Sequence, residues 1–313
     1  CKKLKINKKN LKLNEYQAVA ALGQIELMNI FKIAFSKKRI NVAQILLTLD
    51  DTENRRRSLN AKDTIRTLHK INILPIVNEN DTTATSEIRY GDNDRLAARV
   101  AQITEADTLI MLSDIDGLFT KNPKKYKDAK IINKITKIDK RITDSATKSL
   151  SDYGSGGMIT KIEAAKICMN TGCNMIISNG LKNNPVKSIN KFKKFTWFVP
   201  KTNKVNSKKK WILSSINTKG AIIVDDGAKK ALLSGKSLLP VGIVNFRGFF
   251  QRGDTIQVLS KNFKNIAIGV SAYSSEDISQ IKGLKSEQIK NVLGYSSRGE
   301  VIHANNMVIS ENE

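Results

Sequence analysis

Short apolar runs alternate with helical patterns along the first half of the chain, and this alternation most limits the folds open to it. A strand followed by a helix and another strand forms a βαβ unit, and repeated units build a mainly parallel sheet. Apolar residues three and four positions apart predict helices, and short apolar runs bounded by polar residues predict buried strands. We therefore expect an α/β domain with strands at 42–47, 73–77, 108–112 and 175–178, and helices at 14–35, 59–71, 94–103 and 162–169.

The polar segment from Asn78 to Asp94 follows the strand predicted at 73–77 and is dense in Asn and Asp. Ligands of open α/β sheets bind outside the carboxyl ends of the strands, so this segment lies where a site is expected. Its last residues, Asp92-Asn93-Asp94, begin a helical pattern, and a helix N-terminus favours anions. Each cluster alone is more simply explained by a helix cap or an Asx-rich turn. Two clusters that bracket one loop favour a binding site.

A second candidate is the Gly-rich stretch 154–157, which leads into a helical pattern that begins near Lys161. Glycine lets a backbone approach phosphate oxygens closely, and a helix N-terminus adds a positive field. A lysine at the end of the loop would supply a point charge for phosphate. The glycines are not spaced as in the common P-loop pattern, so a Gly-Ser surface turn is an equally good interpretation.

Composition argues against several classes of protein. The chain has no run of 18 apolar residues and no signal peptide, so we expect no membrane span and a cytoplasmic protein. Its three cysteines form neither a pairing framework nor a metal spacing, which fits a reducing compartment. The two histidines, His69 and His303, are far apart, so a His-based triad or zinc site is not expected. The net charge of +24 would suit nucleic acid, but the lysines are spread over solvated faces and linkers.

Two stretches of the chain are rich in lysine. Residues 121–150 are rich in lysine and are expected to form a surface excursion. From Leu181 to Lys210 there are ten lysines and no acidic residue, and we place a domain boundary there, between domains 1–204 and 205–313. Beyond it, several short strand-like runs, including one at 301–303, are separated by Gly turns and predict a small β-barrel.

Several motifs follow one another along the chain. In the first domain they are Asn78-Glu79-Asn80-Asp81, Gly91-Asp92-Asn93-Asp94, Ser113-Asp114 with Gly117-Leu118, and Gly156-Gly157-Met158 with Thr160-Lys161. In the second domain they are Lys210-Trp211-Ile212, Val224-Asp225 with Gly227-Ala228, Ser237-Leu238-Leu239-Pro240, Arg252-Gly253, and Ile289 with Leu293-Gly294-Tyr295. No single motif is decisive, but the ordered set covers nearly the whole chain. It resembles the glutamate 5-kinase family, amino-acid-kinase-fold enzymes of proline biosynthesis whose carboxy-terminal domain is a PUA domain.

The resemblance implies an αβα sandwich with a mainly parallel sheet, followed by the PUA-like barrel. It also implies transfer of the γ-phosphoryl group of ATP to the side-chain carboxylate of L-glutamate. The Mg²⁺ ion that this reaction uses is expected to bind mainly to the nucleotide phosphates, and no residue of the chain is assigned as a metal ligand. Phosphoryl transfer depends mostly on positioning and charge neutralisation, so the shortage of histidine is no obstacle.

The resemblance assigns roles to particular residues. Two are catalytic: Lys161 neutralises charge on the transferred phosphoryl group, and Asp94 organises the catalytic lysines. Glutamate is bound by Asp81 and Asn93, with Asn78 and Asp92 nearby. The nucleotide site consists of Ser113, Asp114, Ser155, Gly156, Gly157, Met158, Ile159, Thr160 and Lys161.

One departure from the family concerns the start of the chain. The family begins with a strand and a Gly-rich loop that bears a phosphate-binding Lys, and then has a Gly-Ala-rich turn with a Ser that contacts glutamate. Nothing in residues 1–40 matches either element. We expect roughly 50 residues to precede Cys1 in a complete parent, since a βαβ unit takes about 30 residues or more. We expect that parent, rather than the chain as given, to be active.

Two alternative functions stay open. One is an amino-acid-kinase-fold enzyme for another carboxylate, a carbamate or a nucleotide, which the Asn-Glu-Asn-Asp loop and the attached β-domain disfavour. The other is an RNA-binding PUA protein with a non-catalytic kinase-like domain, which the lack of a clustered aromatic stacking set disfavours. The favoured interpretation is a homo-oligomer that uses L-glutamate and ATP. We expect it to bind neither a membrane nor, through the PUA-like domain, RNA.

Overall fold

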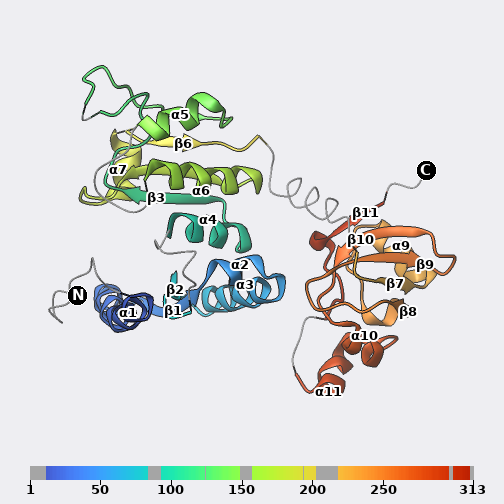
Figure 1. Ribbon diagram of the computed structural model, residues 1–313. Helices are drawn as coiled ribbons and strands as arrows, with labels where there is room; N and C mark the ends of the chain where they lie inside the picture. Colours follow the sequence, from blue (N-terminus) through green and yellow to red (C-terminus); the bar gives the residue numbers. More distant parts are fainter. Residues whose placement is uncertain are drawn as a thin grey trace. The chain divides into compact units, whose positions relative to one another are not determined.

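The computed structural model describes residues 12–83, 93–123, 125–148, 157–192, 194–201, 218–295 and 299–310 (Figure 1). The chain divides into two compact units, Cys1–Thr202 and Asn203–Glu313. The elements of the first unit are α1 (Leu13–Ser36), β1 (Asn41–Leu47), α2 (Leu49–Glu53), α3 (Arg55–Lys70), β2 (Ile73–Glu79), α4 (Asn93–Ile103), β3 (Thr108–Ser113), β4 (Lys134–Ile135), α5 (Lys140–Lys148), α6 (Met158–Asn170), β5 (Asn174–Asn179), α7 (Pro185–Phe192) and β6 (Thr196–Phe198). Those of the second unit are β7 (Ala221–Val224), α9 (Asp226–Leu233), η3 (Pro240–Gly242), β8 (Ile243–Arg247), β9 (Thr255–Ser260), β10 (Asn265–Val270), α10 (Ser275–Ile281), η4 (Ser286–Gln288), α11 (Ile289–Leu293), η5 (Ala304–Asn306) and β11 (Met307–Ile309).

The described strands of the first unit form two sheets in which most pairs are parallel. β1 and β2 pair in parallel, with Asn41 opposite Ile73 and Leu47 opposite Glu79. The other sheet has the order β3-β5-β6-β4, in which β5 is parallel to β3 and antiparallel to β6, and β6 is parallel to β4. The helix α3 connects β1 to β2, and α4 connects β2 to β3. The predicted α/β class, with alternating strands and helices and mainly parallel pairing, is confirmed.

The strand β2 extends two residues beyond the predicted one, through Asn78 and Glu79. Its pairing with β1 continues to the end of both strands, and the amide of Asn80 then donates to the carbonyl of Leu47 at 3.0 Å. Asn78 and Glu79 were predicted to begin the polar loop, and that boundary was wrong. Hydrogen bonding to a neighbouring strand overrides the weak strand preference of these residues.

The Lys-rich stretch 121–150 was predicted to be a surface excursion, but it contains β4 and α5. Ile135 in β4 is buried and lies opposite Phe198 in β6. A strand of two residues is too short to show a period of two in the sequence, so pattern analysis could not detect it. These two elements were missed, although Asn122 and Ile135 are the only buried residues among those whose burial is described in this stretch, as expected of a surface excursion.

The helices α4 and α6 lie side by side (Figure 1) and pack through small residues. Ala98 in α4 and Ala164 and Ala165 in α6 are fully buried in one core cluster. The distance between packed helices depends on the side chains at the contact, so alanine allows a close approach. The first turns of these helices carry Asp94 and Lys161, and the packing therefore sets the distance between those two residues.

Among the described residues, α1 is the one helix long and apolar enough to span a membrane, judged by length and composition alone. It lies against β1, yet none of its residues is buried, and Ile25 and Ile30 are 70% and 64% exposed. The sequence contains no uninterrupted apolar run of that length, because Glu26 and Lys32 lie within the helix. The expectation that nothing spans a membrane stays a prediction.

The second unit is built on a five-stranded sheet in the order β11-β10-β9-β7-β8, with β7 parallel to β9 and the other neighbours antiparallel. Its core cluster includes the fully buried Phe250 and Tyr273. The strand predicted at 301–303 is an isolated bridge between Ile302 and Leu238, and the strand β11 lies further along the chain. The apolar run at 301–303 reflects burial in the core rather than membership of the sheet.

Candidate functional site

The two residues predicted to be catalytic, Asp94 and Lys161, contact each other. The ammonium Nζ of Lys161 lies 2.9 Å from Oδ2 of Asp94, and the two side chains are only 12% and 19% exposed. The hydroxyl of Thr160 lies 2.8 Å from the same carboxylate oxygen and 2.7 Å from the carbonyl oxygen of Gly157. Asp94 therefore holds Lys161 and Thr160 at the start of α6. Residues 94 and 161 are far apart in sequence, and the packing of α4 on α6 brings them together.

The N-terminus of α6 offers further donors to an anion. Gly157 occupies the cap position and has no side chain that could accept from the first amides of the helix. Such amides at a helix N-terminus favour phosphate groups. Met158 is buried in the core, so its backbone rather than its side chain is available to a ligand, whereas Ile159 is exposed. Ser155 and Gly156, also predicted for the nucleotide site, lie outside the described residues.

Two of the residues predicted to bind glutamate, Asn78 and Asn93, contact each other. The Nδ2 group of Asn93, in the first turn of α4, donates to Oδ1 of Asn78, near the end of β2, at 3.2 Å. Asn93 directly precedes Asp94, so this pair adjoins the one that holds Lys161. Asp92, also predicted for this site, lies outside the described residues.

A cavity of about 210 Å³ opens beside the end of β2. Asp81 lines it, and burial raises the pKa of this carboxyl group above its usual range. Glu79 also lines it and is only 7% exposed. The other lining residues are Ala20, Ala21, Gln24, Ile25, Gln44, Leu46, Asn80 and Thr82. Two partly or fully buried carboxyl groups in one small cavity give it a negative potential that suits an amine.

Among the described residues that line this cavity, Asp81 is the one polar residue that was predicted for the site; Gln24, Gln44, Glu79, Asn80 and Thr82 were not. Glu79 belongs to the motif that carries the family resemblance, but no role was given to it. Gln24 lies in α1, far from every motif, and because α1 also contains Gln17, nothing in the sequence singles out Gln24. Its Oε1 accepts from Nδ2 of Asn78 at 2.7 Å, a contact that only the folded chain reveals.

Ser113 and Asp114 lie at the carboxyl end of β3, as predicted, with Ser113 opposite Asn179 of the parallel strand β5. The hydroxyl of Ser113 lies 3.1 Å from Oδ1 of Asp114, and the carbonyl of Ser113 accepts from the amide of Gly180 at 2.7 Å. The loop that follows lies tightly against β6: a Cβ at Gly117 would be 2.6 Å from the hydroxyl of Thr196. Among the described residues, no hydrogen bond joins Ser113 or Asp114 to the Asp94–Lys161 pair.

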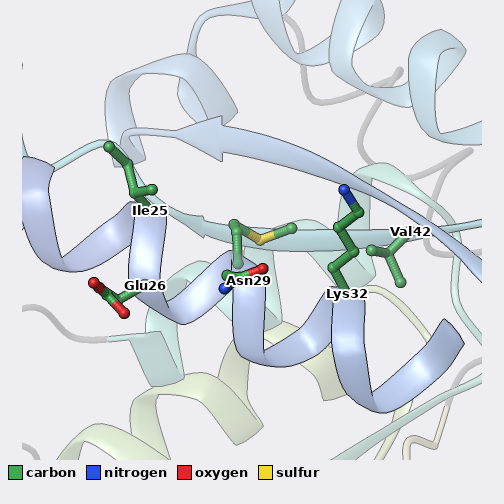
Figure 2. Close-up of a pocket in the computed structure, with 6 residues that line it drawn as sticks. Ile25, Glu26, Asn29, Lys32 and Val42 are labelled. Atoms are coloured by element: carbon green, nitrogen blue, oxygen red, sulfur yellow. The ribbon is translucent and has the colours of Figure 1, made fainter. Parts of the chain in front are cut away.

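A second cavity, of about 330 Å³, lies between α1 and β1 (Figure 2). Its lining consists of Ile25, Glu26, Met28, Asn29, Lys32 and Val42. Figure 2 shows Lys32 beside Val42, with Glu26 directed away from the strand. None of the predicted site residues lines this cavity, so we assign the chemistry to the smaller one.

The comparison with protein families gives the class first. The amino acid kinase family model matches residues 1–179, and the PUA domain model matches residues 220–293. Among curated relatives, the glutamate 5-kinase of Pelagibacter ubique (strain HTCC1062) is 59% identical over 308 residues, which cover 98% of this chain and 84% of that protein. The glutamate 5-kinase of Paramagnetospirillum magneticum (strain ATCC 700264 / AMB-1) is 47% identical over 299 residues, covering 96% and 81%. The chain belongs to the glutamate 5-kinase family.

Proposed function

We propose that the protein catalyses the ATP-dependent phosphorylation of the side-chain carboxylate of L-glutamate to L-glutamyl 5-phosphate, the first step of proline biosynthesis. The likeness to proteins named glutamate 5-kinase over 98% of the chain carries this proposal. The cavity beside β2 and the Asp94–Lys161 pair support it, because one suits a small amino acid and the other suits a phosphoryl group.

Glutamate binds in the cavity at the end of β2. The carboxylates of Asp81 and Glu79 take its ammonium group, since opposite charges attract strongly where water is largely excluded. Asn93, which begins α4, donates from its side-chain Nδ2 to a substrate oxygen and keeps its hydrogen bond to Asn78. Asp92 lies nearby in sequence and completes the proposed glutamate site.

The phosphates of ATP lie at the N-terminus of α6, within reach of Lys161 and the amides that follow Gly157. Ser113, Asp114 and the segment from Ser155 to Thr160 form the rest of the proposed nucleotide site. Mg²⁺ in kinase sites keeps substrate phosphates and waters as ligands rather than an all-protein cage. Among the described residues, no group of three or more His, Cys, Asp or Glu side chains could hold a metal ion. When bound, the ion neutralises phosphate charge.

The side-chain carboxylate of glutamate attacks the γ-phosphorus, a new O–P bond forms, and the bond to the β-phosphate oxygen breaks to release ADP. A carboxylate is already ionised at neutral pH, so no general base has to remove a proton. The ammonium of Lys161 stabilises the charge on the transferring group, and Asp94 fixes its position. The chemistry thus needs positioning and positive charge, and a Lys161 held by Asp94 would contribute to both.

The test is glutamate-dependent release of ADP by the full-length protein, with ATP in excess. L-Aspartate, which is one methylene shorter, is the matched control substrate, and it should support much less release. Release that does not depend on glutamate, or that is equal with aspartate, would refute the assignment of substrate.

We also propose that the protein acts in the cytoplasm as a homo-oligomer, with a kinase domain at 1–204 and a PUA-like domain at 205–313. The division of the structure between Thr202 and Asn203 supports this domain boundary.

RNA binding by the second unit is the weaker candidate. The PUA match favours it, as do the exposed rings of Phe249 and Phe263. The guanidinium of Arg247 lies 4.1 Å from the ring centroid of Phe263, an arrangement that also occurs where bases stack. A binding constant that falls steeply with salt, and that differs between RNA sequences, would support it.

A further inference from the structure

The two polar atoms of the Gln24 side chain differ: Oε1 has a hydrogen-bond partner, whereas Nε2 has none among the described residues. Its Oε1 accepts from Nδ2 of Asn78 at 2.7 Å, so this end is fixed. Its Nε2 is buried and has no hydrogen-bond partner among the residues that the structure describes. Nearly all buried polar groups in folded proteins have a partner, and an unpaired donor is costly. Such a donor in a binding cavity is explained if a ligand supplies the acceptor.

Gln24 lies at the place where a ligand is expected. It lines the 210 Å³ cavity together with Glu79, Asn80 and Asp81. The two acidic side chains supply acceptors for an ammonium group, and a substrate carboxylate would be an acceptor for Nε2 of Gln24. One cavity thus contains acceptors for an ammonium group and a donor for a carboxylate, which are the two charged groups on the α-carbon of an amino acid.

Gln24 also belongs to a chain of amides that leads toward the reacting groups. Gln24 in α1 accepts from Asn78 in β2, and Asn78 accepts from Asn93 in α4. The next residue, Asp94, holds Lys161. Gln24 is therefore the member of this chain farthest from the lysine that contacts the phosphoryl group. The reacting side-chain carboxylate belongs at the Lys161 end, which leaves the α-carboxylate for Gln24.

We propose that Gln24 is a substrate-positioning residue: its Nε2 donates to the α-carboxylate of the amino-acid substrate, while its Oε1 orients Asn78 and, through it, Asn93. This inference rests on the proposed function, and it adds a specificity determinant from a helix that carries none of the recognised motifs. It gives a role to the amide that α1 places against the end of β2.

Two substitutions separate the two ends of the amide. Gln24→Leu removes both the donor and the acceptor. Gln24→Glu keeps an oxygen that can accept from Asn78 but replaces the donor by a second oxygen. In the full-length protein, both variants should raise KM for glutamate by about 10- to 100-fold, the range of a hydrogen bond to a charged group, with KM for ATP little changed. Asn29→Leu, an exposed residue of the same helix outside this cavity, is the control and should leave both values unchanged.

The substrate analogue 4-aminobutyrate keeps the ammonium and the reacting carboxylate but lacks the α-carboxylate. Its inhibition constant against glutamate should be nearly the same in wild type and in Gln24→Glu, because this variant keeps the oxygen that accepts from Asn78. Equal losses for glutamate and 4-aminobutyrate in that variant, or a Gln24→Glu variant with a wild-type KM for glutamate, would overturn the proposed role of the donor. Thermal unfolding of each variant shows whether the fold has changed.

The possible failures are distinguishable. A wild-type protein without glutamate-dependent ADP release would overturn the proposed function, and this inference would fall with it. An active wild type together with a Gln24→Leu variant whose KM for glutamate lies within twofold would overturn the inference alone.

Discussion

The two units of the protein differ in how their buried apolar residues are grouped. The buried residues of the second unit form one cluster around Phe250 and Tyr273, which are both fully buried. The described buried residues of the first unit form two separate clusters, and the smaller one consists of Leu47, Ala61 and Leu96. The helix α1 contributes none. The described buried residues in these clusters thus form a single core in one unit and two cores in the other.

The first unit also contains polar features that lower its stability, and they lie at the proposed site. In the first unit, burial raises the pKa of Asp81, and Nε2 of Gln24 has no partner among the described residues. Both features are unfavourable in the absence of a ligand. Active sites commonly retain such features because function selects them over stability. The second unit has none of the residues assigned to chemistry, and its role in stability can be tested separately.

The largest expected change in stability follows from Phe250→Ala. Phe250 is fully buried and packs edge-to-face on Phe246, with ring centroids 6.4 Å apart. Truncation should destabilise the second unit by about 3–5 kcal/mol. Phe249→Ala is the matched control, since Phe249 is 64% exposed and its loss should change stability by about 0.5 kcal/mol at most. Denaturant unfolding measures both, and glutamate-dependent ADP release should be kept by both. Loss of activity together with the second unit's fold would show that the two units are not independent.

The next largest effect concerns Lys161. Lys161→Met keeps the apolar stem and removes the charge that the proposed function places on the transferring phosphoryl group. The kcat should fall by about 10²–10³-fold, by analogy with the loss of one preorganised donor. Lys166→Met is the control, because Lys166 is an exposed residue of the same helix and should leave kcat unchanged. Steady-state kinetics measures both, and a Lys161→Met enzyme within tenfold of wild type would contradict a role in transfer.

A smaller effect is expected at the glutamate end of the site. Asp81→Ala and Asn93→Ala each remove hydrogen bonds to a small charged ligand, worth about 1.5–3 kcal/mol apiece. In the full-length protein, KM for glutamate should rise about 10- to 100-fold while KM for ATP changes little. The KM for ATP serves as the internal control. A change in that value instead would mean that this part of the first unit binds the nucleotide.

Much of the first unit could be predicted because its elements have strong local signals. The strand 108–112 and the helix 94–103 differ from β3 and α4 by one residue at one end. Other features depend on pairing between distant segments. The two residues of β4 carry no period, and Asn78 joins β2 only because β1 runs beside it. Local sequence cannot encode such partners.

The site shows the same division between local and distant information. The polar ends of β2 and β3 and the start of α6 were predicted, because strand ends and helix starts are local features. The contact of Gln24 with Asn78 joins α1 to β2 and involves side chains that are 54 positions apart. The approach of Lys161 to Asp94 spans 67 positions, and without the family resemblance nothing in the sequence would pair them.

The smallest expected effect is on how stability depends on pH. It compares Asp81, in the proposed site, with Asp51, an acidic residue outside that site. Burial raises the pKa of Asp81 in the folded protein. Its contribution to stability is therefore fully present below the ordinary pKa of Asp, about 3.9, and is lost as pH rises through the raised value. Without glutamate, Asp81→Asn should raise the thermal midpoint of the first unit at neutral pH, and the gain should vanish in acid.

Asp51 is the matched control of opposite sign. Burial alone would raise its pKa, but hydrogen bonds donated by Thr48 and Arg57 outweigh this effect and lower the pKa. The stability that this group contributes is present above the ordinary pKa of Asp and is lost as pH falls through the lowered value, so Asp51→Asn should destabilise the protein at neutral pH. Thermal unfolding of both variants between pH 3 and 8 spans the ordinary pKa near 3.9. Saturating glutamate should reverse the sign for Asp81→Asn only, because the ionised carboxylate then has the ammonium group as its partner. A stability gain at Asp81 that persists with glutamate bound would mean that this carboxyl group does not contact the substrate.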